Sequence, residues 1–278
     1  MRVVLFHYHI FKNSGTTFDH AIKRKLGRRF VEHDARPGEK SILQSEVGTL
    51  IHNYSDVLAF SSHTARLPAP RIEGIKVEPV VFVRHPILRL KSIYSWLKKT
   101  NLKVKLKSLA KISDMPDRDF ARKQSLTSRS FEHWIAQLID SERGRNHISN
   151  AQTQLLSGHY EIRPKRVSVE SHGERLFDLN QAKKNLSEVK LLGRTENFDE
   201  DMNRFIPYLL DMGIPLDNKK LKPRNVTDKN FNLPLDSRIL NIQNQLGPEL
   251  SDSLDKLISQ DLELFRWVEN TLASKRCL

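Results

Sequence analysis

The chain has 278 residues, of which 38% are hydrophobic and 28% charged, and it carries one cysteine, Cys277. This composition argues against global disorder, and the single cysteine excludes an internal disulfide and a cysteine-based zinc finger. The 46 Lys and Arg residues exceed the 33 Asp and Glu residues by 13, which favours a polyanionic partner such as nucleic acid, an anionic membrane, an acidic polysaccharide or a phosphorylated ligand. No stretch approaches the ~20 apolar residues of a membrane-spanning helix.

Continuous apolar runs, each followed by a polar turn and a helical pattern, recur along the chain. Such runs are typical of buried parallel strands, and amphipathic spacing of apolar residues is typical of helices. Strands alternating with helices predict an α/β fold, a single domain over 1–278 with a central parallel sheet flanked by helices. We expect strands at 3–6, 57–60, 79–83 and 189–192, and helices at 18–26, 41–53, 86–97, 131–139, 150–157, 197–210, 236–246 and 249–273.

Residues 98–129 differ in composition from the rest of the chain. They hold ten Lys or Arg residues against three Asp residues and show little helical periodicity. We interpret them as a mobile basic insertion within the domain rather than as a second domain. Residues 158–178 are expected to be irregular, and 217–235 to form a polar loop.

The first strand and the first helix are joined by residues 12–17, Lys-Asn-Ser-Gly-Thr-Thr. A loop in this place can bind an anion through the backbone N–H groups at the helix N-terminus. Gly15 allows close approach of the backbone, Thr16 and Thr17 add hydroxyl donors, and Lys12 adds a positive charge. The loop lacks the Gly-Lys pair of the G-x-x-x-x-G-K-[ST] pattern, which weakens an ATP or GTP kinase interpretation. An ordinary strand-to-helix turn is the alternative.

A second segment, 80–94, also runs from a strand into a helix. Arg84 follows the strand, where α/β folds gather their ligands, and its guanidinium suits a phosphate. Pro86 is typical of a helix start, and Ser92 lies about two turns further on, so its hydroxyl can face the same anion. The alternative is a helix start with an exposed Arg and Ser. Arg89 is equally consistent with an ion pair and a ligand contact.

Both segments resemble motifs of the PAPS-dependent carbohydrate sulfotransferases, in particular the heparan sulfate 2-O and 6-O types and their bacterial relatives. Residues 9–18 resemble the loop that binds the 5′-phosphosulfate of PAPS (3′-phosphoadenosine 5′-phosphosulfate) in that family. Residues 80–94 resemble the segment whose Arg and Ser bind the 3′-phosphate. Weaker matches follow in order at 150–158, 192–198 and 261–265. The resemblance implies a P-loop-like domain with cofactor contacts from Lys12, Asn13, Ser14, Gly15, Thr16, Thr17, Arg84 and Ser92, although Asn13 and Ser14 depart from the family pattern.

The reaction implied by the resemblance moves a sulfuryl group from PAPS to a carbohydrate hydroxyl by in-line attack and leaves PAP. Lys12 is placed to stabilise charge on the leaving phosphate. His63 follows the strand at 57–60 and is our preferred base, with a Glu or another His as competitor. Arg224, in the late polar loop, is either a cofactor contact or a solvated charge. His7 and His9 share one strand face, but no third ligand is apparent, so we expect no metal site.

The acceptor is less determined than the donor. The net charge favours an anionic polysaccharide, while a neutral sugar, a glycolipid and a lipid alcohol stay open. The basic stretch 98–111 is either an acceptor groove or a solvated loop. No nucleic-acid partner is expected, because no helix-turn-helix, RRM-like or zinc pattern occurs. We expect a cytoplasmic protein, with the membrane face where glycans are made as an alternative. The competing functions are a P-loop nucleotide or sugar kinase and a polyanion-binding protein without catalysis.

Overall fold

The computed structural model describes residues 1–36, 41–104, 123–158, 168–169, 175–217 and 231–274. The chain divides into two compact units, each assembled from separate parts of the sequence. The first unit takes Met1–Arg84, Gln152–Lys165 and Asp178–Asn225, and the second takes His85–Ala151, Arg166–Phe177 and Val226–Leu278. Among the described residues, no helix is both long and apolar enough to cross a membrane.

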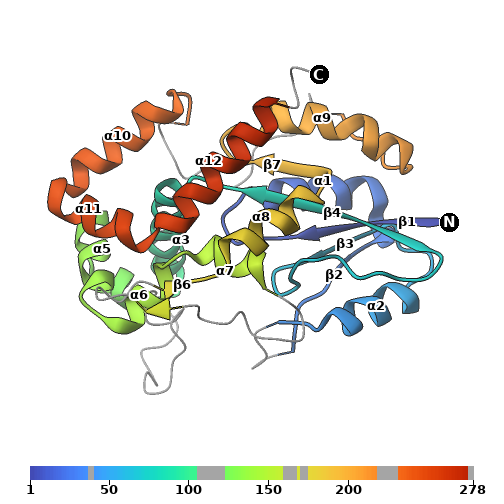
Figure 1. Ribbon diagram of the computed structural model, residues 1–278, viewed down its shortest axis with the longest axis horizontal. Coiled ribbons are helices and arrows are strands. Elements are labelled where there is room, and N and C mark those ends of the chain that lie inside the picture. Colours follow the sequence, from blue (N-terminus) through green and yellow to red (C-terminus); the bar gives the residue numbers. More distant parts are fainter. Residues whose placement is uncertain (37–40, 105–122, 159–167, 170–174, 218–230, 275–278) are drawn as a thin grey trace. The chain divides into compact units, whose positions relative to one another are not determined.

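The first unit is built on a five-stranded, all-parallel sheet with the strand order β2-β3-β1-β4-β7 (Figure 1). In the central strand β1, Leu5 pairs with Ala59 on one side and with Glu78 on the other. This confirms the predicted α/β fold with a central parallel sheet, and it brings the carboxyl ends of all five strands to one edge. The strands are β1 Arg2–Tyr8, β2 Phe30–Glu32, β3 Ala59–Ser62, β4 Ile75–Val83 and β7 Leu191–Arg194.

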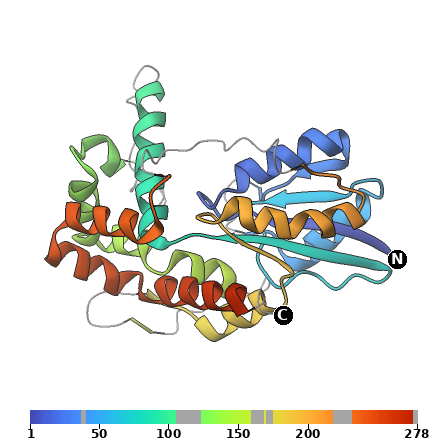
Figure 2. The ribbon, with the colours of Figure 1, turned by 90° about the horizontal axis from the view of Figure 1, so that it is seen from above.

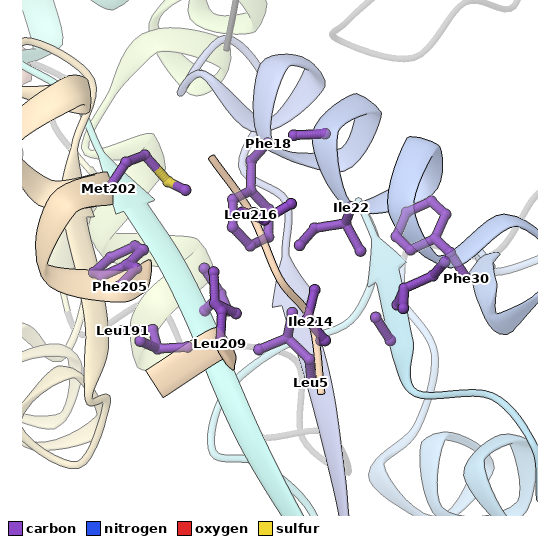
Figure 3. Close-up of a cluster of buried hydrophobic side chains, with 14 of the residues drawn as sticks. Leu5, Phe18, Ile22, Phe30, Leu191, Met202, Phe205, Leu209, Ile214 and Leu216 are labelled. Carbon is purple, nitrogen blue, oxygen red and sulfur yellow. The ribbon is translucent and has the colours of Figure 1, made fainter. Parts of the chain in front are cut away.

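Helices α1 and α9 pack on the same face of this sheet (Figure 3). Phe18 and Ile22 of α1 and Phe205 of α9 are fully buried there, together with Leu5 of β1. Helix α1 ends at Leu26 and is followed by Gly27, whose φ of 56° glycine adopts without steric cost. The helices of this unit are α1 Gly15–Leu26, η1 Gly27–Arg29, α2 Gln44–Asn53, α8 Leu179–Ser187 and α9 Phe198–Asp211, and α7 Ala151–Ser157 begins at its boundary.

The second unit is mainly helical, with an aromatic core. Tyr94 of α3 lies with its ring centroid 5.7 Å from that of Phe131 and 5.5 Å from that of Trp134, which is fully buried. A short antiparallel pair, β5 and β6, completes it. The elements are α3 Pro86–Val104, α5 Phe131–Ile139, α6 Glu142–Ile148, β5 Ser168–Val169, β6 Arg175–Leu176, α10 Leu235–Leu246, α11 Pro248–Leu257 and α12 Ser259–Ser274.

The start of the expected insertion 98–129 is helical, because α3 continues to Val104 as one helix (Figure 2). Residues 105–122 lie outside the described residues. The β5–β6 pair falls inside the segment expected to be irregular. The expected strand at 189–192 is displaced to Leu191–Arg194, and β2, α6 and α8 were not predicted.

The expected helix 249–273 was also wrong, since it is interrupted at Ile258 and forms α11 and α12. The interruption has a cause far away in the sequence. The side-chain oxygen of Asn150 accepts hydrogen bonds from the backbone N–H groups of Gln260 at 2.9 Å and Asp261 at 3.2 Å. Asn150 therefore caps the first turn of α12, as a neighbouring cap residue would do.

Candidate active site

The loop between β1 and α1 has the backbone geometry of an anion-binding turn. Lys12 has a φ of 69° and Ser14 a φ of 61°, left-handed values that are uncommon for residues other than glycine and cost of order 1–3 kcal/mol each. Left-handed residues at alternate positions turn successive N–H groups toward one concave surface. Ser14 is the N-cap of α1 but makes no side-chain capping bond. The side chain of Ser14 thus leaves the helix start uncapped, while its carbonyl oxygen accepts from the N–H of Thr17 at 3.0 Å.

Buried amide side chains fasten this loop to the end of β4. The Nδ2 of Asn13 donates to the carbonyl oxygen of Phe82 at 2.9 Å and to Oε1 of Gln152 at 2.7 Å. Gln152 also accepts from the N–H of Arg84 at 3.0 Å and donates to its carbonyl oxygen at 2.8 Å. Both amide protons of Asn13 are therefore used inside the protein. Sequence analysis missed Gln152 as a site residue. The match at 150–158 is weak by itself and supported the family resemblance only by its position among the other motifs along the chain.

His63 follows β3 at the carboxyl edge of the sheet. Its Nδ1 lies 3.0 Å from the carbonyl oxygen of His9. A carbonyl oxygen only accepts, so Nδ1 carries the proton and Nε2 of the neutral ring is an acceptor. The main-chain N–H of His63 donates to Oδ1 of Asp34 at 2.6 Å. Although the residue is exposed overall, desolvation of its ring, and next the charge of His9, lower the pKa of His63, so the ring is neutral near pH 7, as a general base must be.

A buried carboxylate lies between the two histidines of β1. Asp19 of α1 accepts from Nδ1 of His7 at 2.7 Å, from Nδ1 of His9 at 2.8 Å and from Oγ of Ser61 at 2.8 Å. Burial alone would raise the pKa of Asp19, but the charge of His7 and the hydrogen bonds from both rings outweigh it and hold this pKa well below its usual range. No third ligand beside His7 and His9 was apparent from the sequence, and the structure places Asp19 there. An Asp on the apolar face of a helix was the signal in the sequence.

The distances in this cluster are those of hydrogen bonds. One nitrogen or oxygen atom from each of His7, His9 and Asp19 lies within 4.8 Å of the others. A tetrahedral zinc ion with bonds of about 2.0 Å would hold its ligand atoms about 3.3 Å apart, whereas the nitrogen–oxygen distances are 2.7 and 2.8 Å. We therefore interpret the cluster as a carboxylate that orients two imidazole rings.

A cavity of about 270 Å³ joins the loop to the candidate base. Thr16, exposed at the start of α1, and His63 both line it. Its volume is close to the lower end of small-molecule sites, about 300 Å³. A hydroxyl group admitted to this cavity would lie near both the anion-binding turn and an imidazole nitrogen. The other lining residues are His9, Asp19, His20, Lys23, Glu32, Asp34, Ser61 and Ser62.

Comparison with known proteins identifies the family of the chain. The model of a sulfotransferase family matches residues 2–267, nearly the whole chain. The chain belongs to this sulfotransferase family. It is also similar to an uncharacterized protein of Archaeoglobus fulgidus, with 28% identity over 275 residues that cover 96% of each chain.

The predicted cofactor residues of this sulfotransferase are distributed over both units. Arg84 ends the first unit, where its Nη1 donates to the carbonyl oxygen of Lys12 at 2.9 Å and its Nε lies 3.4 Å from Oε1 of Glu196. Arg84 thereby braces the loop from the end of β4. Ser92 is buried on α3, in the second unit. Arg224 lies outside the described residues.

Proposed function

We propose that this sulfotransferase is a single domain over 1–278 that uses PAPS as donor and a carbohydrate hydroxyl as acceptor. The observation that carries the proposal is the shared cavity, which Thr16 of the anion-binding turn and His63 line together. A group that binds the donor and a group that activates the acceptor are thus adjacent. Sulfuryl transfer requires this adjacency because the acceptor oxygen must approach the sulfur in line with the bond that breaks.

Each residue has a distinct task in this scheme. PAPS supplies an activated sulfuryl group that passes to the acceptor oxygen, while PAP leaves with the electron pair of the broken bond. The amides of the turn and Lys12 stabilise the negative charge on the leaving phosphate. Nε2 of His63 accepts the proton of the acceptor hydroxyl. The donor contacts proposed are Lys12, Ser14, Gly15, Thr16, Thr17, Arg84, Ser92 and Arg224, whereas the amide of Asn13 is committed to holding the loop.

The fit of the donor is supported by the chemistry of the turn. Two left-handed residues, an uncapped helix start and a lysine are what a phosphate ester or phosphosulfate requires. The net charge of +13 supports an anionic polysaccharide as acceptor, although it is a property of the whole chain. A cytoplasmic location and a reaction without a metal ion complete the proposal.

The test is a calorimetric titration of the protein with PAP, repeated with ATP and in the presence of EDTA. We expect micromolar binding of PAP that EDTA does not change, and much weaker binding of ATP. Lys12→Ala should abolish binding or transfer while the fold is retained, and Lys25→Ala, at an exposed position of the helix α1 that follows the loop, is the matched control. Absence of PAP binding by folded protein would overturn the proposal, and EDTA-sensitive ATP binding would favour a nucleotide kinase.

A further inference from the structure

The ring of His9 lies directly against the anion-binding turn. A methyl group added at Gly15 would lie 2.2 Å from Cδ2 and 2.3 Å from Nε2 of His9. The ring is buried, with 8% of the residue exposed, and it lines the cavity that holds Thr16 and His63. The edge of the ring that carries Nε2 therefore faces the residue from which α1 starts.

Asp19 fixes which nitrogen of His9 carries a proton. The ionised carboxylate only accepts, so Nδ1 of His9, 2.8 Å away, is the donor. In the neutral ring Nε2 then presents a lone pair to the turn, and in the charged ring it presents an N–H group. A lone pair repels a bound anion, whereas a charged N–H group forms a strong hydrogen bond with it. The affinity of the turn for an anion thus depends on the charge of His9.

The surroundings of His9 keep the ring neutral when the turn holds no anion. Burial is the largest influence and lowers the pKa of His9, and the charge of His7 on β1 lowers it further. The hydrogen bond and charge of Asp19 on α1 and the charge of Asp34 after β2 act in the opposite direction without reversing the shift. His63 at the end of β3 lies with its ring centroid 3.9 Å from that of His9.

We propose that binding of an anion in the turn is coupled to the uptake of one proton by His9, whose Nε2–H then donates to that anion. The proton comes from solvent and returns to it when the anion leaves. The inference rests on the proposed function, since the anion is the 5′-phosphosulfate end of the donor or the 5′-phosphate of PAP. A charged His9 has a second effect. It lowers the proton affinity of His63 and so keeps the base neutral while donor is bound.

The test is calorimetry with PAP at pH 7 in two buffers of different ionisation enthalpy. The dependence of the binding heat on buffer gives the number of protons taken up. Phosphate esters themselves titrate near pH 6, so the informative quantity is the difference between variants. His9→Asn keeps an amide donor for Asp19 but does not titrate. His52→Asn, an exposed position of α2, is the matched control.

We expect the wild type and His52→Asn to take up about one proton more per PAP than His9→Asn, the single proton that one imidazole can accept. Equal proton uptake by wild type and His9→Asn would overturn this inference and leave the proposed function intact. Absence of PAP binding by folded wild type would overturn both. Should His9→Asn fail to fold, ¹⁵N spectroscopy of the wild-type imidazoles decides. The His9 ring must become protonated on addition of PAP, and a ring that stays neutral overturns the proposal.

Discussion

The Nδ1 of His63 donates to the main-chain carbonyl oxygen of His9 across 3.0 Å, which joins the end of β3 to the end of β1. This bond fixes the tautomer of the candidate base through a main-chain partner, so no second side chain is needed. The carbonyl fixes the orientation of the ring. Desolvation of the ring and the charge of His9 lower the pKa of His63 and outweigh the charge of Asp34 and this hydrogen bond, which raise it. The functional consequences of this arrangement can be measured.

His63→Gln should reduce kcat by ~10²–10⁴-fold, the usual contribution of general base catalysis. The affinity for PAP should stay within a factor of a few, because the base acts on the acceptor. His33→Gln, at an exposed position just after β2, serves as the control. Steady-state kinetics with an identified acceptor, together with PAP calorimetry, separate the two effects. Unchanged kcat in His63→Gln would assign the base elsewhere.

The pH dependence of the wild type should carry the same signature. The pKa of His63 is lowered, mainly by desolvation of its ring, so it lies below the usual histidine value of about 6.5. As the pH is lowered, kcat/KM should therefore begin to fall only when the pH reaches this lowered pKa. The acidic limb of the pH–rate profile should lie below pH ~6.5. A limb above that value would show that another group limits the reaction.

Gly15→Ala should weaken PAP binding at least tenfold. The added methyl group would lie 2.2 Å from the ring of His9, so either the ring or the turn must move. Gly48→Ala is the matched control, since its new methyl group would lie 4.0 Å from Ile72, an ordinary contact, and alanine favours a helix by up to about 1 kcal/mol over glycine. Equal PAP affinities for the two variants would show that the close packing at Gly15 is unrelated to binding.

Asn13→Ala and Gln152→Ala should each lower the free energy of unfolding by about 1–3 kcal/mol, because each leaves a buried polar partner unsatisfied. The two side chains share a hydrogen bond of 2.7 Å. The double variant should therefore be less destabilised than the sum of the single variants. Chemical denaturation of the four proteins measures the coupling, and strict additivity would contradict the shared bond.

Asp19→Asn should change how stability depends on pH. Burial would raise the pKa of Asp19, but the hydrogen bonds and charge of the histidines hold it far below the unfolded value of about 3.9. The unfolded chain therefore takes up a proton near pH 4 that the folded protein does not, so the contribution of Asp19 is present above that pH and is lost as the pH falls. Melting temperatures from about pH 6 to about pH 3 should fall more steeply for wild type than for Asp19→Asn.

The sequence was most informative where structure depends on neighbouring residues. The continuous apolar runs of β1 and β4, and the spacing of Phe18 and Ile22 on α1, identify the central sheet and its first helix without further information. The short β2 carries no comparable run, because three residues are too few to show a period. The sequence predicts one helix in place of α11 and α12 for a related reason. Both have the helical spacing of apolar residues, and no Pro or Gly marks the break at Ile258.

At the candidate site, prediction from the sequence failed where contacts join distant segments of the chain. Gln152 holds the loop through bonds to Asn13 and Arg84, which lie 139 and 68 residues away. No pattern of neighbouring residues in the sequence indicates hydrogen bonds between segments so far apart. Asp19 is different, since a carboxylate on a buried helical face must have a buried partner. Its place in the helix could have pointed to the histidines of β1.

The alternation of the two units along the chain also bears on how this protein can be inherited. Three segments of each unit alternate, so the chain passes from one unit to the other five times. A single recombination within 85–225 divides both units, and neither can be exchanged between genes as a contiguous cassette. The similarity to the archaeal protein extends over 96% of both chains and so takes in segments of both units.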